Sequence, residues 1–405
     1  MRMSRSPSST STLWRRNLWV IWFAQFTAIL GFSSVVPILP FYVQQLGVTD
    51  PNAVKFWSGA IFSAHAITMA VMAPIWGTLA DRYGRKPMVE RAMFGGAVAI
   101  GLMSLARTPL QLALLRAFQG ALTGTVAAAT TLVASMAPRD HLGRSLGLLQ
   151  MAIYAGSSFG PMMGGVVADT LGFRATFWTT GSLLFLGGLM VFLWVQENFS
   201  PPLSRTQRLS LLESVRAALS STALASVFGV RFLARTAGRL LAPVLPLVVQ
   251  SLVPAGAAAT ISGVVQGLNS AAGAAGAVVL GRLSDRLGER RVMLPCLLSS
   301  AVLHIPQYFV GSIVPLVVLY TLSGFAMGGT ITALSATLAS LAPAGRQGTV
   351  YGLESTFTSL ANAIGPMLST TLAVVGGLRM PFLGTAACFS LAGLATAYLV
   401  RERQP

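Results

Sequence analysis

Long apolar runs recur along the whole of this 405-residue chain. A run of about 18 or more apolar residues can cross the ~30 Å hydrocarbon core of a bilayer. Every backbone hydrogen bond inside a bilayer must be made within the protein, and runs without polar alternation suit helices better than barrel strands. The sequence therefore predicts an all-α membrane protein. Its twelve predicted transmembrane helices lie at 19–45, 56–80, 87–106, 110–136, 144–168, 174–195, 222–250, 258–281, 291–310, 313–341, 349–376 and 379–400.

The formal net charge of +17 follows this predicted topology. Most of the 28 Lys and Arg residues fall in the two termini and in the loops on the same side of the membrane. The opposite side carries only Lys55, Arg107, Arg174 and Arg379. By the positive-inside rule we expect both termini to be cytoplasmic, as an even number of spans requires. Nucleic acid is excluded as a partner, because the longest polar connection, 196–221, is too short to form a basic soluble domain.

The chain repeats itself after about half its length. GTLADRYGRK, from Gly77 to Lys86, returns as GRLSDRLGER, from Gly281 to Arg290, and PILPFYVQQL in the first span matches PVLPLVVQSL in the seventh. Such a duplication predicts two pseudo-symmetric bundles of six helices. We expect a flexible cytoplasmic tail at 1–18, an N-terminal bundle at 19–195, a cytoplasmic linker at 196–221, a C-terminal bundle at 222–400 and a short cytoplasmic tail at 401–405.

Three motifs carry a resemblance to a known family. The loop that begins at Gly77, between the second and third spans, resembles the signature loop of the major facilitator superfamily. GSSFGPMMGG, from Gly156 to Gly165 in the fifth span, resembles the Gly-Pro motif of the drug:proton antiporter branch. Arg116 and Gln119 in the fourth span are similar to the R-x-x-Q-G element of that branch. The resemblance implies the major facilitator fold, alternating access between the two halves, and proton-coupled export of drugs.

The signature loop also has a physical interpretation. A carboxylate at the end of the second span can accept hydrogen bonds from a helix N-terminus and from nearby Arg, and so form a latch that breaks when the halves move. The resemblance places this latch on the cytoplasmic side, between the two halves. The alternative is that these charges only anchor the topology. The predicted latch residues are Gly77, Asp81, Arg82, Gly84, Arg85, Lys86, Asp285 and Arg286.

A second predicted feature is a strip of small residues in the fifth span. Gly156, Gly160 and Gly164 recur every four residues, so one helix face is bare and a neighbouring helix can approach closely. Pro161 removes a backbone donor within the strip. The resemblance implies that this antiporter seam lies against the eighth or eleventh span and limits leakage.

Charged residues inside spans are the strongest indication of what is carried. An Arg near the bilayer centre costs ~2.5 to 3.5 kcal/mol on insertion scales, so it should face a wet cavity or a partner. Arg231, Arg235 and Arg239 share one face of the seventh span, and we expect Arg231 to reach the membrane interface. Arg116, Gln119, Arg235 and Arg239 are candidates for binding the substrate, with intramolecular pairing as the alternative for Arg235 and Arg239.

Few groups within the spans can carry a proton. Glu354 in the eleventh span is the carboxylate that falls inside a predicted helix, and its alternative role is to pair with an Arg. Many drug:proton antiporters carry an acidic residue in the first or fourth span, whereas the first span here offers Gln25 and Gln44 and no carboxylate, so coupling through a first-span acid is not supported. Gln25 is a further candidate for substrate binding or coupling. His65 and His304 are weaker proton-carrier candidates, because a lone buried His more often serves packing.

The sequence therefore predicts a secondary transporter of the cell membrane that exports amphipathic compounds in exchange for protons. A cavity rich in Arg and poor in acid would accept anions more readily than lipophilic cations. A metabolite importer or facilitator and a lipid or glycolipid flippase are the alternatives on the same fold. The sequence has no motif for an enzyme, a cofactor or a metal site. The expected partners are a small amphipathic substrate, protons and the lipid bilayer, and we expect a monomer.

Overall fold

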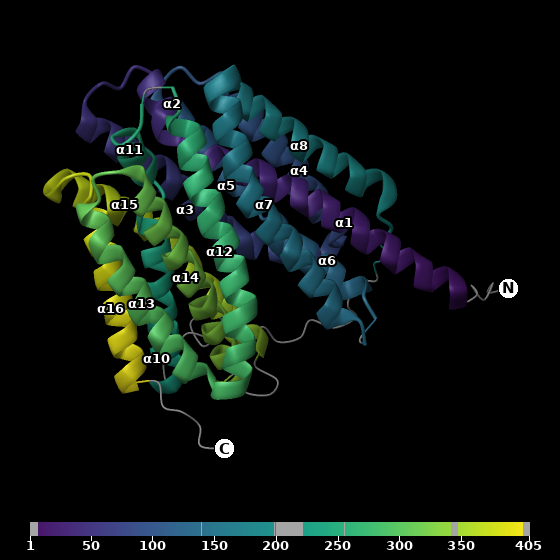
Figure 1. Ribbon diagram of the computed structural model, residues 1–405. Helices are drawn as coiled ribbons and strands as arrows, with labels where there is room; N and C mark the ends of the chain where they lie inside the picture. Colours follow the sequence, from purple (N-terminus) through teal and green to yellow (C-terminus); the bar gives the residue numbers. More distant parts are fainter. Residues whose placement is uncertain are drawn as a thin grey trace.

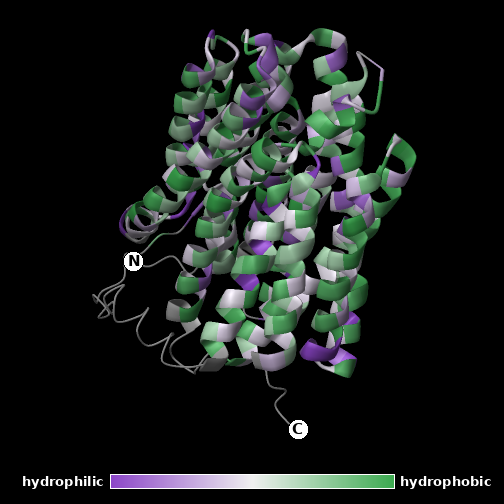
Figure 2. Cartoon of the chain, turned by 90° about the vertical axis from the view of Figure 1, so that its left-hand side faces the viewer, coloured by the Kyte–Doolittle hydropathy of each residue, from purple (hydrophilic) through white to green (hydrophobic). Residues whose placement is uncertain are grey.

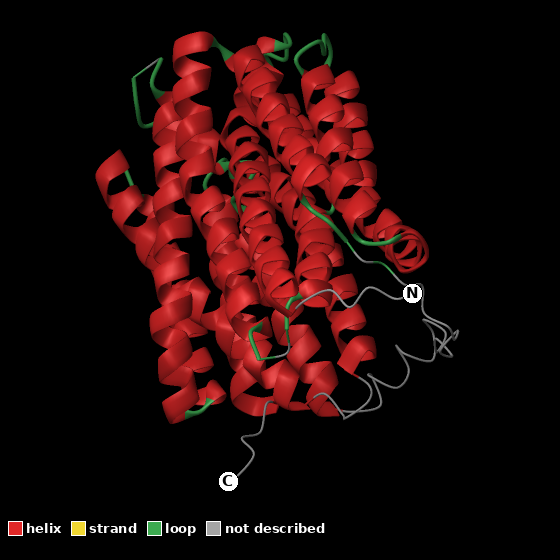
Figure 3. Cartoon of the chain, turned by 90° about the vertical axis from the view of Figure 1, so that its right-hand side faces the viewer, coloured by secondary structure: helices red, strands yellow, loops and turns green. Residues whose placement is uncertain are grey.

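A computed structural model describes residues 7–138, 140–197, 199, 222–254, 256–341 and 347–399. All the regular elements in these ranges are helices (Figures 1 and 3). The helices are α1 (Pro7–Val35), η1 (Val36–Ile38), α2 (Leu39–Gln45), α3 (Pro51–Tyr83), α4 (Lys86–Met103), α5 (Pro109–Leu122), α6 (Thr125–Met136), α7 (Leu142–Leu171), α8 (Phe173–Trp194), α10 (Thr222–Leu240), α11 (Leu245–Gln250), α12 (Ala258–Leu287), α13 (Glu289–Phe309), α14 (Ile313–Leu341), α15 (Gln347–Gly376) and α16 (Met380–Leu399).

Each of the twelve predicted spans corresponds to a helix or to a helix broken in two. Ten of these segments are long and apolar enough to cross a membrane. The third and fifth spans, α4 and α7, fall short of that measure: α4 is brief and begins with charged residues, and α7 is rich in Gly and Ser. Hydrophilic residues gather at the helix ends and between the helices, while apolar residues dominate elsewhere (Figure 2). The chain is a multi-pass membrane protein.

Three of the predicted spans are interrupted, which the apolar pattern did not reveal. The first bends at η1, which contains Pro37 and is followed by Pro40 at the start of α2, and the seventh breaks between α10 and α11 around Pro243. Proline removes a backbone donor and clashes with the preceding turn, so it can break a helix even in an apolar run, although α7 continues through Pro161. The fourth breaks between α5 and α6, where Gly124 has a φ of +126°. That conformation favours glycine, because a Cβ atom would be strained there.

The predicted flexible tail at 1–18 is wrong from Pro7 onwards, because α1 already begins at that residue. The turn of helix before the membrane is tied to the rest of the bundle: the Asn17 side chain donates to the backbone carbonyl of Gln196 at 2.8 Å, and Trp14 stacks on His141. Residues 1–6, most of the predicted linker and the predicted tail at 401–405 lie outside the described residues.

The helices form two groups that touch each other at one end (Figure 1). One cluster of buried side chains lies almost wholly in α1–α8, with Leu247 and Ala259 added where the groups meet, and two further clusters lie in α10–α16. Contact between the groups runs mainly through α7 with α12 and α3 with α15. The groups come together at the end where α2 and α11 lie, and they spread apart toward the end where both termini lie. We call these the closed end and the open end.

Close backbone approach in the bundle predicts a specific sensitivity to side-chain size. A Cβ atom at Gly164 would lie 2.1 Å from the Ser34 carbonyl oxygen, so Gly164→Val must push α1 and α7 apart. Overpacking of this kind costs about 1 to 3 kcal/mol. We expect a Tm several degrees lower in detergent, measured by the thermal unfolding of the purified protein.

Gly143→Val is the matched control, because Gly143 lies in the same helix with no atom within 4 Å of an added Cβ. Equal losses of Tm in the two variants would show that the cost comes from the valine itself and not from the helix contact.

Candidate functional site

The glycine strip of α7 packs within its own half of the molecule. Atoms added at Gly156, Gly160 and Gly164 would collide with α1, at Ile29, Leu30 and Ser34. The expectation that this strip faces the eighth or eleventh span is therefore wrong. Helices pack on more than one side, and spacing by four residues indicates a close neighbour without indicating which helix it is.

The eighth span does lie against α7, but on a different face. A Cβ at Gly165 would lie 2.3 Å from the Ala259 carbonyl oxygen of α12, and one at Gly263 would lie 2.1 Å from the Pro161 carbonyl oxygen. Gly267 makes a similar approach to Ser158. The contact between the halves is thus built from glycines of both helices, with Pro161 of the Gly-Pro motif at its centre.

Polar contacts complete the closed end. Gln44 and Gln250, at the ends of α2 and α11, exchange two amide hydrogen bonds of 3.0 and 3.1 Å. Lys55 of α3 donates to the Ala373 carbonyl oxygen of α15 at 3.1 Å. The backbone N–H of Thr260, in the first turn of α12, donates to the Asp169 carboxylate of α7 at 2.7 Å. The closed end is therefore held by apolar packing together with breakable hydrogen bonds.

The predicted latch lies at the open end, and the hydrogen bonds and the ion pair of its described first-copy residues stay within the first half. Gly84 ends α3 with a φ of +99°, as the tight turn requires. Lys86 pairs with Glu90 at 3.5 Å and donates to the Phe192 carbonyl oxygen of α8. Arg82 lies over the Tyr83 ring. Gly77 has nothing within 4 Å of an added Cβ, and the Asp81 side chain lies outside the described residues.

A different carboxylate, that of Glu197, accepts hydrogen bonds from the helix that follows this loop. Glu197, just after α8, accepts from the backbone N–H groups of Arg85 and Lys86 at the start of α4, at 2.8 to 3.0 Å. A carboxylate is stabilised at a helix N-terminus by the unpaired N–H groups and by the helix dipole. Glu197 falls at the start of the predicted linker, 196–221, and nothing in its spacing indicates α4 as its partner.

The second copy of the loop differs in its side chains. Asp285 and Arg286 are exposed, and Gly288 ends α12 in the same left-handed conformation as Gly84 ends α3. Arg290 donates to the Ala397 carbonyl oxygen of α16 at 2.6 Å, as its repeat partner Lys86 donates to α8. Both copies thus join the start of one span to the end of the span three places later.

The first half contributes a buried polar group between α3 and α5. Arg116 donates to the Gln119 side chain at 2.7 Å and lies over the Phe62 ring, and all but about 5% of Arg116 is buried. His65 of α3 lies within electrostatic range of Arg116 and of Arg239 from the other half. These predicted residues therefore come together near the junction of the halves.

Gln25 stands apart from this group. It is fully buried in α1, and neither its amide nitrogen nor its amide oxygen has a hydrogen-bond partner among the described residues. Leaving such a group unpaired costs free energy. Among the described residues, no hydrogen bond joins Gln25 to the other candidate residues.

Glu354 is paired with Arg231. The Arg231 guanidinium of α10 forms an ion pair with the Glu354 carboxylate of α15 and also donates to the Ser335 hydroxyl of α14 at 3.2 Å. Their side chains are 6% and 19% exposed, so the expectation that Arg231 reaches the membrane interface is wrong. The nearby carboxylate, which the sequence could not pair with it, makes burial of the guanidinium tolerable.

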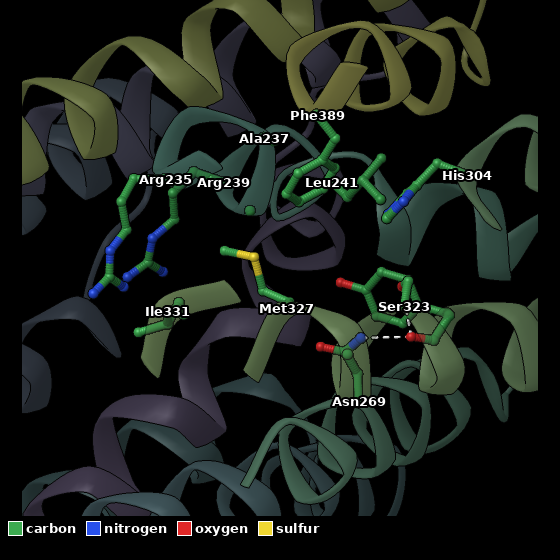
Figure 4. A pocket seen from close by; sticks show the side chains of 13 residues that line it. Arg235, Ala237, Arg239, Leu241, Asn269, His304, Ser323, Met327, Ile331 and Phe389 are labelled. Carbon is green, nitrogen blue, oxygen red and sulfur yellow. Dashed lines mark hydrogen bonds between the residues drawn. The ribbon is translucent and has the colours of Figure 1, made fainter. Parts of the chain in front are cut away.

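The other two arginines of α10 line a chamber of about 200 Å³ inside the second half. Arg239 donates through Nε to the Asn362 side chain at 2.9 Å, and it remains exposed, which places it on the open space between the halves. Figure 4 shows Arg235 and Arg239 side by side, with the His304 ring directed into the same chamber. The full lining is Arg235, Ala237, Gly238, Arg239, Leu241, Asn269, His304, Tyr320, Ser323, Gly324, Met327, Ile331 and Phe389.

The chamber is lined by residues of several helices whose proximity the sequence did not indicate. His304 comes from α13 and its Nδ1 lies 2.7 Å from the Ser300 carbonyl oxygen, while Asn269 of α12 donates to the Tyr320 carbonyl oxygen at 2.6 Å. Polar residues inside apolar spans were the available signal for Asn269 and Tyr320. Across the described residues, no group of three or more His, Cys, Asp or Glu is placed to hold a metal ion.

Two membrane-embedded helical groups that meet at one end and enclose charged residues between them define a secondary transporter. The Major Facilitator Superfamily model matches residues 21–230 and 227–405. The chain belongs to the major facilitator superfamily.

Individual relatives agree with this assignment. The chain is 35% identical over 382 residues to the multidrug resistance protein MdtG of Salmonella typhimurium and to that of Salmonella arizonae, with 94% of each chain covered. Among solved structures, the nucleoside transporter NupG shares the fold with a TM-score of 0.78 at 13% identity, covering 95% of this chain and all of that one. The human organic anion transporter MFSD10 does so with a TM-score of 0.68 at 19% identity, over 97% of this chain and all of that one.

The Arg231–Glu354 pair predicts an asymmetric response to substitution. Removing Glu354 alone leaves a buried guanidinium without its counter-charge, so we expect Glu354→Leu to destabilise the protein by about 3 kcal/mol, seen as a lower Tm in detergent. The double variant Arg231→Met with Glu354→Leu should recover most of that loss. A double variant as unstable as the single one would show that packing, and not charge pairing, governs this site.

Proposed function

We propose that this transporter exports amphipathic compounds in exchange for protons, with both termini in the cytoplasm. The observation that carries the proposal is the 35% identity, over nearly the whole chain, to proteins named for multidrug resistance. The Gly-Pro motif in α7 supports it, since Pro161 lies at the main contact between the halves.

The topology follows from the charges. Placing the Arg-rich loops and both termini on the cytoplasmic side makes the open end face the cytoplasm. The described conformation then exposes Arg239 and its surroundings to substrates inside the cell. Rocking of the two six-helix halves, 19–195 and 222–400, would close that end and open the other. The whole path lies within one chain, so a monomer suffices.

Glu354 is the proposed proton carrier. It lies about two turns into α15, and its only ion-pair partner among the described residues is Arg231. Proton binding to the carboxylate would cancel the pair and leave Arg231 with the Ser335 hydroxyl alone. One proton that enters down a ~100 mV potential supplies ~2.3 kcal/mol, enough to sustain a substrate gradient of more than tenfold.

Transport in proteoliposomes with an imposed pH gradient tests this function. We expect the gradient to drive ethidium or carboxyfluorescein across the membrane, and we expect Glu354→Gln to lose the dependence on the gradient while retaining exchange of substrate down its own gradient. Asp140→Asn, in an exposed loop, is the control.

Two results would contradict the proposal. No gradient-driven movement of either dye would remove the antiporter assignment. Movement in the same direction as the protons would favour the importer alternative.

A further inference from the structure

Arg235 and Arg239 leave a positive charge in the second half that the described residues do not neutralise. They are four residues apart on one helix face, so their like charges repel. The nearest carboxylate in charge range of Arg235 is Glu354, which is already paired with Arg231. Among the described residues, Arg239 has a single hydrogen bond, through Nε to a neutral amide, and its terminal nitrogens make none. Charge in a membrane interior is costly unless a partner or water compensates it.

The chamber beside these two side chains has the size and lining of a subsite. Its volume of about 200 Å³ is below the 300 to 1,000 Å³ of pockets that hold a whole drug-sized ligand, so it suits one chemical group. The polar groups of Asn269, Tyr320 and His304 line it together with the apolar side chains of Met327 and Phe389. Figure 4 shows the two guanidinium groups at one side of it, and Arg235 lies within electrostatic range of Arg239.

We propose that this chamber is a subsite for the anionic group of an amphipathic substrate, a carboxylate, sulfonate or phosphonate, held between Arg235 and Arg239. A planar guanidinium binds such oxyanions through paired, charge-assisted hydrogen bonds. The apolar body of the substrate extends past Met327 and Ile331 into the space between the halves. The proposal rests on the transport function proposed above and names the substrate class that the second half selects.

Binding to the purified protein in an uncharged detergent tests the subsite without transport. The probe is carboxyfluorescein, followed by its fluorescence anisotropy, with ethidium as the cationic comparison. The combined variant Arg235→Gln with Arg239→Gln should weaken carboxyfluorescein binding by about 10- to 100-fold and leave ethidium binding unchanged or tighter. Arg239→Lys should lie between this variant and the parent chain.

Arg282→Gln is the matched control, because Arg282 is an exposed residue at the open end of α12. Equal carboxyfluorescein binding by the parent chain and the double variant, or equal weakening in the Arg282→Gln control, would overturn the subsite. Ethidium binding shows that the variants are folded. Because binding needs no pH gradient, failure of proton coupling and failure of the subsite are separate results.

A different observation carries a second inference, about the closed end. The sequence ADTLG, from Ala168 to Gly172 at the end of α7, repeats the pattern of ADRYG, from Ala80 to Gly84 at the end of α3. Both segments end with a glycine of positive φ whose N–H donates to the alanine carbonyl oxygen four residues earlier. The two Asp residues therefore occupy the same position in the same helix ending, on opposite sides of the membrane.

Asp169 caps the N-terminus of α12, which has no capping side chain of its own. Helix α3 is capped by its own Asp50, which accepts from the Ala53 N–H at 2.7 Å. The equivalent helix of the second half, α12, begins after Ala257, which has no side chain able to cap it. The Asp169 carboxylate, from the other half of the molecule, accepts from the Thr260 N–H in that first turn.

We infer that Asp169 is a latch for the closed end, the counterpart of the latch that the signature loop predicts for the open end. The bond between Asp169 and Thr260 must break when the halves separate there. A carboxylate at a helix N-terminus is worth enough to change the ratio of the two states by about 2- to 30-fold. Asp169 therefore biases the resting protein toward the conformation described.

Disulfide cross-linking across the closed end tests the latch. Gln44→Cys with Gln250→Cys, in a chain whose Cys296 and Cys388 are replaced by alanine, places two thiols where the amides now meet. Asp169→Asn should lower the cross-linking rate, at most by the factor of about 2 to 30 by which it changes the ratio of the two states, and Asp169→Glu should restore most of it. A rate that Asp169→Asn changes no more than the exposed-loop control Asp140→Asn would overturn the inference. Rescue by glutamate separates loss of the latch from misfolding.

Discussion

The close approach of α7 to its neighbours is the constraint on which the arrangement of the whole molecule depends. On one face its glycines touch the backbone of α1, and on another its Gly165 and the facing Gly263 bring α7 against α12. Without a hydrophobic driving force between helices inside lipid, such backbone contact is what makes association favourable. One helix therefore belongs firmly to its own half and also forms the main surface along which that half meets the other.

The sequence was sufficient to predict the class of fold, but it was insufficient to predict which distant segments contact one another. Apolar runs and the repeat predicted an all-α membrane protein of twelve spans. The structure has a helix or a broken helix at each of them, and ten of these segments are long and apolar enough to cross a membrane. The breaks at Pro37, Gly124 and Pro243 were visible as residues, but an apolar run does not show whether a proline bends a helix or ends it. The early start of α1 depends on Asn17 reaching Gln196, a contact between distant segments.

In the candidate site, too, the sequence predicts where side chains lie on a helix but not which residues they contact. Spacing placed Arg231, Arg235 and Arg239 on one helix face, but their different roles follow from which residues of α14 and α15 lie opposite. Arg231 pairs with a carboxylate and Arg239 donates to an amide, while Arg235 has neither partner among the described residues. The partner of a buried charge is a tertiary property, so it cannot be read from the helix that carries the charge. The pattern shared by Ala168–Gly172 and Ala80–Gly84 is the exception, since it can be read in the sequence itself.

The paired contacts of Lys86 with Phe192 and of Arg290 with Ala397 have a mechanical consequence. Each ties the beginning of one span to the end of another within the same half, and both lie at the end where the halves are apart. Each half is thus braced at the end where the two halves lie apart. In the rocking motion proposed above, this bracing would let each half turn as a stiff unit about the closed end, so that a small rotation where the glycines touch becomes a larger displacement at the open end.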